Sequence, residues 1–358
     1  MSELTELGWD DSFAEQFTQY ADQGLVPGRV AVQHRGAWDV LTERGALRCD
    51  IPGRLYNDAA STAELPVVGD WVAVAERPGE DAGTIQAVLP RRTRFSRKTA
   101  WQATEEQVLA ANIDVVFLVS SVNEDLSLRR LERYLTLAWE SGAQPVVVLT
   151  KVDLTDDRES ALAEVGAIAV GAPVHGVSSV TGEGLDALRA YLRPGVTAAL
   201  LGSSGVGKST LVNTLAGEEL LETKEIRSDG KGRHTTVRRE LIRLPTGALV
   251  IDTPGMRELQ LWEADDGIDE AFEDVTALFG SCRFSDCAHE SEPGCAIKEA
   301  LDDGRLDRAR WESYVKLQRE LEHLERRLDH REQAAAKRRW KILSTQAREN
   351  VRMKGRRD

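Results

Sequence analysis

The residues best suited to chemistry in this sequence form a glycine-rich run from Gly202 to Thr210. The run follows the apolar segment TAALL and precedes an amphipathic one, so it fits the GxxxxGK(S/T) pattern between a strand and a helix. The backbone N–H groups of such a loop, with the helix N-terminus behind them, bind phosphate oxygens. Lys208 would contact the outer phosphates and assist catalysis, and the Ser209 hydroxyl would ligate Mg²⁺. The predicted nucleotide-binding residues here are Gly202, Ser203, Ser204, Gly205, Val206, Gly207, Lys208, Ser209 and Thr210.

Two segments upstream of this loop could recognise the base. Thr150-Lys151-Val152-Asp153 closes the apolar run PVVVLT, and Ser178-Ser179 follows a second apolar run. A carboxylate such as Asp153 accepts hydrogen bonds from both the ring N–H and the exocyclic amine of guanine, a donor pair that adenine lacks. The Ser178-Ser179 backbone would support the base from the other side. We therefore predict GTP or GDP as the ligand, although TKVD alone is also compatible with an ordinary approach to a helix N-terminus.

Two further segments downstream could sense the terminal phosphate. Asp252-Thr-Pro-Gly255 ends an apolar run and would place a carboxylate near Mg²⁺ and the Gly255 N–H near the phosphate. A polar, glycine-rich stretch contains Thr236 as the predicted second Mg²⁺ ligand, although the sequence does not separate it from Thr235.

The residue that would orient the attacking water is not the expected one. Met256 stands after Gly255, where a water-positioning glutamine is usual, and a thioether cannot replace a glutamine. His234 is the nearest alternative, since an imidazole can hydrogen-bond water near neutral pH. We expect slow intrinsic hydrolysis that improves when a partner orders the loop around His234. A plain solvated role for His234 is the alternative.

A cysteine cluster near the C-terminus predicts a metal site. Three of the four cysteines lie within Cys282-x4-Cys287-x-His289-x5-Cys295. Three thiolates and one imidazole suit a closed tetrahedral Zn²⁺, which leaves no open position for catalysis. We therefore predict one structural zinc. A disulfide is the poorer alternative because three clustered cysteines cannot all pair, and catalytic zinc would need an open position.

The elements around these motifs predict an α/β protein with two additional domains. Short alternating valine-rich runs over residues 28–102 favour an OB-type β-barrel, because closure removes sheet edges. Apolar strands alternate with helices over 103–275, as in a mostly parallel sheet covered on both faces. The remaining predicted parts are an acidic, frayed or weakly helical leader at 1–27, a helical zinc-binding domain at 276–345 and a basic tail at 346–358.

The charge of the chain is unevenly distributed. The 358 residues carry a formal net charge of -13, but Arg331 to Asp358 contain ten basic and three acidic residues, so the first 330 residues carry -20. RRTRFSRK, from Arg91 to Lys98, adds five positive charges in eight residues. Such basic runs can contact a phosphate backbone, so the acidic mean does not exclude nucleic acid. Neither a signal peptide nor an apolar stretch of about 20 residues is evident, which favours a cytoplasmic protein with no membrane partner.

The order of the motifs is unusual, because the two base-recognition segments precede the phosphate loop. This order indicates a circularly permuted GTPase domain. Together, the barrel, GSSGVGKST, GRHTT, DTPG and the cysteine cluster resemble the bacterial family of GTPases that depend on the small ribosomal subunit, called RsgA or YjeQ. The resemblance covers about residues 28–345. In that family the base-recognition loop usually begins with Asn, which ties it to the phosphate loop, so Thr150 is expected to cost some nucleotide affinity.

The resemblance implies GTP hydrolysis stimulated by the small ribosomal subunit, a role in late maturation of that subunit, and contact with its rRNA. Our leading hypothesis is that GTP hydrolysis triggers release from the subunit, and we expect a monomer. The alternative is an RNA-binding assembly module stabilised by nucleotide, in which hydrolysis is incidental. Under both hypotheses, we expect the barrel domain to bind RNA.

Overall fold

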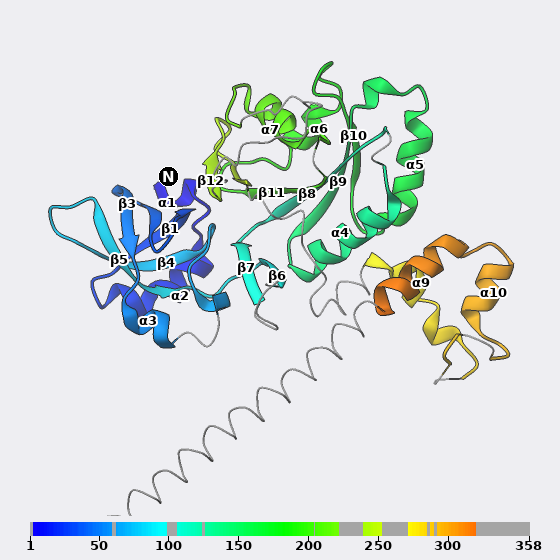
Figure 1. Cartoon of the computed structure of the whole chain (residues 1–358), viewed down its shortest axis with the longest axis horizontal. Coiled ribbons are helices and arrows are strands. Elements are labelled where there is room, and N and C mark those ends of the chain that lie inside the picture. Colours follow the sequence, from blue (N-terminus) through cyan, green and yellow to red (C-terminus); the bar gives the residue numbers. More distant parts are fainter. Residues whose placement is uncertain are drawn as a thin grey trace, which may run out of the picture.

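The computed structural model describes residues 3–58, 62–98, 106–123, 126–203, 205–221, 239–252, 271–284, 287–289 and 292–319. Three parts follow one another along the chain in Figure 1: a barrel in blue, a larger sheet with helices in cyan to green, and a group of helices in yellow and orange. Within the described residues, no helix is long and apolar enough to cross a membrane.

The first part is a closed five-stranded barrel, as predicted from the alternating valines. Its strands are β1 (Val26–Gln33), β2 (Trp38–Thr42), β3 (Gly45–Asp50), β4 (Trp71–Glu76) and β5 (Ala82–Val88). They pair in the order β1-β2-β3-β5-β4, and β4 returns to β1, so the barrel has no free edge among them. Val30, Val40 and Ile85 are fully buried inside it. A short helix, α3 (Gly53–Asp58), and the 3₁₀ turn η1 (Thr62–Glu64) connect β3 to β4.

The acidic leader is helical, so of the two expectations for it, frayed or weakly helical, the first is wrong. It forms α1 (Glu3–Glu6) and the eleven-residue α2 (Asp11–Ala21), whose N-terminus is capped by the Asp10 carboxylate at the N–H groups of Ser12 and Phe13. Phe13 is buried, and the Trp9 ring packs edge-on against Trp71 of the barrel, 4.7 Å between centroids. The leader is therefore folded onto the barrel by its aromatic face.

A buried arginine joins the leader, the barrel and the second part. The Arg29 guanidinium donates to the carbonyl oxygens of Leu7, Gly69 and Asn112, and it lies 5.5 Å from the Trp71 ring centroid. Burial lowers the pKa of Arg29 to about 10. Because the three carbonyl groups belong to three different segments, one buried side chain fixes their mutual position.

The second part is built on a mostly parallel sheet. Its strands are β8 (Val115–Ser121), β9 (Gln144–Thr150), β10 (Val174–Val177), β11 (Thr197–Leu201), β12 (Glu240–Arg243) and β13 (Leu249–Asp252). They lie in the order β10-β9-β8-β11-β13-β12, and only β12 runs antiparallel to its neighbour in this sheet. The strand before the phosphate loop, β11, thus lies centrally, between β8 from earlier in the chain and β13 from later.

Helices cover both faces of this sheet, which explains why β8 is buried along its whole length. Leu131 of α4 (Leu128–Glu140) and Val165 of α5 (Arg158–Ile168) pack in one apolar cluster. Leu188 of α6 (Leu185–Arg189) and Leu211 of α7 (Lys208–Ala216) pack in another, with the alternate residues of the same strands. Figure 1 shows α4 and α5 on one side and α6 and α7 on the other.

A small separate sheet follows the barrel. It consists of β6 (Arg94–Lys98) and β7 (Glu106–Ala111), and β1 also meets β12 through one pairing, Val32 with Glu240. The basic run at 91–98 is only partly available to a partner. Two nitrogen atoms of the Arg91 guanidinium donate hydrogen bonds to the two oxygens of the buried Asp70 carboxylate. Arg92 is paired with Asp10 and lies over the Phe13 ring. These two cations serve the fold, which corrects the expectation for the whole run.

The third part consists of short helices. It includes α9 (Glu273–Thr276), η4 (Phe279–Ser281), α10 (Ala296–Asp302) and a helical segment over 308–319. The predicted tail at 346–358 lies outside the described residues.

We predict that Phe13→Ala destabilises the protein by about 3–5 kcal/mol, because it leaves a cavity between the leader and the barrel. Denaturant unfolding followed by tryptophan fluorescence measures this effect, since Trp9 and Trp71 lie beside the site. Glu15→Ala, at an exposed position of the same helix, is the control. A loose leader would leave both variants at the wild-type midpoint.

Candidate functional site

The predicted phosphate and base segments meet at one edge of the sheet. Parallel strands end at the same edge, so the segments after β9, β10 and β11 lie close together there. In the sheet, Val177 at the end of β10 is paired with Thr150 at the end of β9. The segments Lys151–Asp153 and Ser178–Ser179 therefore begin side by side. The sheet alone therefore brings together segments that are separated in the sequence.

The phosphate loop has the backbone that its glycines predict. Gly202 has no room for a side chain, because a Cβ there would lie 2.3 Å from the Val119 carbonyl oxygen. Gly207 has a φ of 97°, a left-handed conformation that favours glycine, and it caps the start of α7. The Lys208 ammonium donates to the carbonyl oxygens of Gly202 and Ser203, at 2.8 and 2.6 Å. The lysine thus lies along the loop, where its charge faces the loop interior.

Thr150 ties the base-recognition loop to the phosphate loop. Its hydroxyl donates to the Val206 carbonyl oxygen at 2.6 Å and also lies 3.2 Å from that of Ser120. The neighbouring Lys151 adopts a left-handed φ of 62°, and its ammonium donates to the Gly205 carbonyl oxygen at 2.9 Å. The link that we expected to be lost with the usual Asn is therefore present, because a threonine hydroxyl reaches the same loop.

The second base segment is a turn held by hydrogen bonds to Ser178. The buried Ser178 hydroxyl accepts hydrogen bonds from the N–H groups of Val180 and Thr181. Ser179 is half-buried, whereas Asp153 is exposed in η2 (Val152–Leu154). Leu154 and Val180, beside these two residues, are among the most exposed large apolar side chains described. Neither residue was predicted from the sequence, although their places next to Asp153 and Ser179 were a usable signal.

Several predicted site residues lie outside the described residues. They are Ser204, His234, Thr235, Thr236 and Gly255, with Met256. Asp252 ends β13, one strand away from the phosphate loop, which is where its predicted role requires its backbone.

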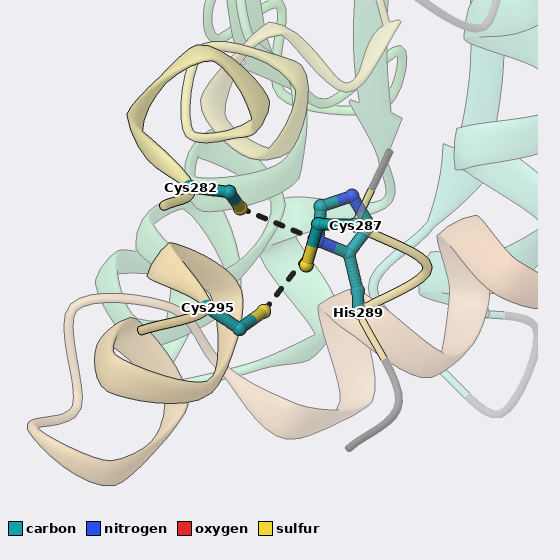
Figure 2. Close-up of side chains that lie close together, drawn as sticks. All are labelled: Cys282, Cys287, His289 and Cys295. Carbon is teal, nitrogen blue, oxygen red and sulfur yellow. Dashed lines mark hydrogen bonds between the residues drawn. The ribbon is translucent and has the colours of Figure 1, made fainter. Parts of the chain in front are cut away.

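The four predicted metal ligands converge in the third part. Figure 2 shows Cys282, Cys287, His289 and Cys295 pointing toward one another, and their ligand atoms all lie within 4.8 Å of one another. The His289 Nδ1 atom is 3.6 Å from the Cys282 sulfur and 3.5 Å from the Cys295 sulfur. A tetrahedral ion with Zn–S of about 2.3 Å and Zn–N of about 2.0 Å requires a sulfur–nitrogen separation of about 3.5 Å. The cluster therefore could hold zinc.

The surroundings hold these ligands in place. Cys295 is the N-cap of α10, and the His289 ring is stacked on Phe279 at 4.6 Å between centroids. Burial lowers the pKa of His289, which favours the neutral imidazole that binds metals. Burial and the neighbouring thiols of Cys295 and Cys282 raise the pKa of Cys287 to about 11. Without a cation the thiol would stay protonated, so a metal ion would release its proton.

A buried arginine attaches this metal cluster to the sheet domain. Arg310 donates to the Glu132 carboxylate of α4 at 2.9 Å, and both side chains are at most 5% exposed. It also binds the Asp274 carboxylate through two nitrogen atoms, at 2.8 and 3.1 Å. This contact was not predicted from the sequence, although Glu132, a carboxylate between Leu131 and Leu135 on the inner face of α4, was a usable signal.

Comparisons with known proteins agree with this architecture. A family model described as RsgA GTPase matches residues 88–262. A small ribosomal subunit biogenesis GTPase RsgA from Opitutus terrae is 50% identical, and the match covers 99% of each chain. Its counterpart from Streptomyces coelicolor is 47% identical, covering 95% of this chain and 92% of that one.

Two solved structures share the fold. YjeQ from Thermotoga maritima is 29% identical with a TM-score of 0.63, covering 83% of this chain and 98% of that chain. YloQ, described as a circularly permuted GTPase, is 25% identical with a TM-score of 0.58, covering 84% and 96%. The strand order described above is thus that of a circularly permuted GTPase.

We predict that Thr150→Val lowers the affinity for GDP roughly tenfold, because the Val206 carbonyl loses its donor while the side-chain shape is kept. Titration with a fluorescent GDP analogue measures the effect. Thr150→Ser keeps a hydroxyl and should retain most of the affinity. If the valine variant bound GDP as tightly as the wild type, the tie between the loops would have no part in nucleotide binding.

Proposed function

The chain belongs to the RsgA GTPase family, and on that basis we propose that it hydrolyses GTP while assisting the biogenesis of the small ribosomal subunit. The observation that carries the proposal is the junction of the two loops: Thr150 and Lys151 both bond to the phosphate loop, at Val206 and Gly205. A base-recognition loop held against a phosphate loop is the requirement for binding a guanine nucleotide. The near full-length similarity to RsgA proteins supports the ribosomal part of the proposal.

The nucleotide would be held along the loops already described. Phosphates would accept hydrogen bonds from the N–H groups of the loop between Gly202 and Ser209, and Lys208 would turn from the Gly202 and Ser203 carbonyls to the outer phosphates. Guanine would lie between Lys151, Asp153 and the Ser178-Ser179 turn, with the exposed side chains of Leu154 and Val180 at its margins. Bound Mg²⁺ would neutralise phosphate charge. The residues that fit its octahedral oxygen coordination are the Ser209 hydroxyl and, from the sequence, Thr236 and Asp252.

Hydrolysis would trigger release from the subunit in this proposal. Met256 offers no hydrogen bond to water, so His234 would position the attacking water once the subunit orders its loop. The barrel, residues 28–102, would contact rRNA, and the protein would act as a cytoplasmic monomer. The competing function, an RNA-binding assembly module with incidental hydrolysis, differs in one respect: it makes release independent of GTP cleavage.

The metal cluster would bind one structural zinc ion within the domain at 276–345. The two sulfur–nitrogen distances and the His289–Phe279 stacking support this assignment. Four protein ligands leave no coordination position for a substrate. The ion would hold a short segment with few apolar residues together.

We predict that purified small ribosomal subunits raise GTP turnover at least tenfold, and that Lys208→Ala abolishes turnover with or without them. Phosphate release measures the rate, and the same assay with His234→Ala tests the water-positioning role.

The protein should also bind the subunit more tightly with a non-hydrolysable GTP analogue than with GDP. Equal affinities, or normal release of the Lys208→Ala variant in GTP, would favour the assembly-module function instead.

We also predict one zinc ion per chain, lost in Cys295→Ser, because a missing thiolate leaves a tetrahedral site with three ligands. Elemental analysis of the purified protein measures the metal. Cys49→Ser is the matched control, since Cys49 is buried in the barrel and belongs to no cluster described. Equal zinc content in both variants would contradict the assignment.

A further inference from the structure

A groove lies where the metal-cluster domain meets the sheet domain. It has a volume of about 430 Å³ and is bordered by the first turn of α4 on one side and the helical segment 308–319 on the other. We call it the basic groove. It is lined by Arg129, Trp311, Glu312, Val315, Lys316 and Arg319.

Buried contacts beneath the basic groove hold its two helices, α4 and the segment 308–319, against each other. Arg310 immediately precedes Trp311, and its guanidinium is buried against Glu132, three residues after Arg129 on the other wall. The Phe272 ring lies 4.0 Å from the guanidinium carbon and closes the joint. Because these partners are buried, the groove is a built feature of the fold at the joint between two domains.

The cations in the basic groove are exposed and contribute little to the fold. Arg129 lies in the first turn of α4, where the helix dipole disfavours cations. Lys316 and Arg319 are exposed on the opposite helix, three residues apart. Exposed charges of this kind add little stability, so they are available to an anionic ligand.

One carboxylate does not neutralise these cations. Glu312 is 60% exposed and lies 4.0 Å from Arg129, at the limit of an ion pair. Within the described ranges, neither Lys316 nor Arg319 is paired with a carboxylate. The basic groove thus carries a net +2 in a chain whose formal charge is -13.

A tryptophan ring adds an apolar surface to the cations. Trp311 is half-buried, stacked on Tyr314 at 5.7 Å between centroids, with the His289 ring edge-on at 5.9 Å. Its remaining surface lines the basic groove. Flat aromatic rings beside basic side chains bind single-stranded nucleic acid, because each base can stack and each phosphate meets a cation.

We propose that the basic groove binds an unpaired stretch of RNA, with phosphates at Arg129, Lys316 and Arg319 and a base against Trp311. This proposal rests on the proposed function, and it assigns to the joint between the two domains a contact with the RNA of the small subunit. RNA bound there touches both domains at once, so its affinity depends on the alignment that Arg310 maintains. An acidic protein segment would satisfy the cations but would leave the flat ring without a matching partner.

The test uses the full-length protein, purified small ribosomal subunits and a non-hydrolysable GTP analogue. The triple variant Arg129→Gln/Lys316→Gln/Arg319→Gln should bind subunits at least tenfold more weakly than the wild type. Its slope of log affinity against log salt should be smaller by about 2, at roughly 0.7 per lost phosphate contact on a single strand. Trp311→Leu should weaken binding about fivefold or more, and Trp311→Phe should restore most of it.

A matched control removes the same charge elsewhere. Arg189→Gln/Arg193→Gln/Arg305→Gln takes three exposed arginines from outside the basic groove and should bind subunits as the wild type does. Zinc content and the unfolding midpoint are measured for every variant, because Trp311 touches the metal ligand His289. A photo-reactive residue placed at Lys316 should crosslink to RNA.

The outcomes separate two failures. If the wild type itself did not bind subunits with the GTP analogue, the proposed function would fail. The proposed RNA site would be wrong if the wild type bound subunits and the folded triple variant bound them equally well. It would also be wrong if the crosslink went to a protein. In both cases the proposed function would stand.

Discussion

The buried guanidinium of Arg310 determines how the metal-cluster domain sits on the sheet domain. It contacts Glu132 on α4, Asp274 on α9 and the Ala271 carbonyl oxygen, so three acceptors satisfy one cation away from water. Removing one partner of a buried ion pair costs about 3–5 kcal/mol, because the other charge stays buried and unpaired. A wrong docking angle would leave Glu132 buried without a donor, so the pair restricts the two domains to one alignment.

The permutation gives this joint a direct connection to the nucleotide site. β13 ends at Asp252 beside the phosphate-loop strand, and Ala271, whose carbonyl accepts from Arg310, follows after only 18 further residues. In the unpermuted order, more strands and helices of the same sheet would follow that point. Here, the next described residues belong to the joint that Arg310 forms. Only 18 residues of chain therefore separate the end of β13 from that joint.

Local patterns predicted the parts of the site that are local in sequence. The glycines at 202, 205 and 207 predicted the loop, the spacing of the cysteines predicted the cluster, and valine alternation predicted the barrel. Arg310 and Glu132, by contrast, are 178 residues apart and lie in ordinary amphipathic helices. The packing of the leader on the barrel could not be predicted for a related reason, since Trp9 and Phe13 contact Trp71, which lies 62 residues after Trp9. Thr150 shows the limit of family patterns, because a different side chain makes the hydrogen bond expected of Asn.

A count of basic residues does not by itself give the positive charge that is available to a partner. A run of arginines in the sequence suggests an RNA contact. However, Arg91 is paired with the buried Asp70 carboxylate, and Arg92 is paired with Asp10 of the leader. Arg129, Lys316 and Arg319 come from two distant parts of the sequence, but folding brings them into one groove. The difference lies in the partners: Arg91 and Arg92 are matched to carboxylates within the fold, whereas the groove cations have one exposed carboxylate near them, 4.0 Å from Arg129. In the described part of the chain, tertiary structure therefore decides which basic side chains are available to a partner.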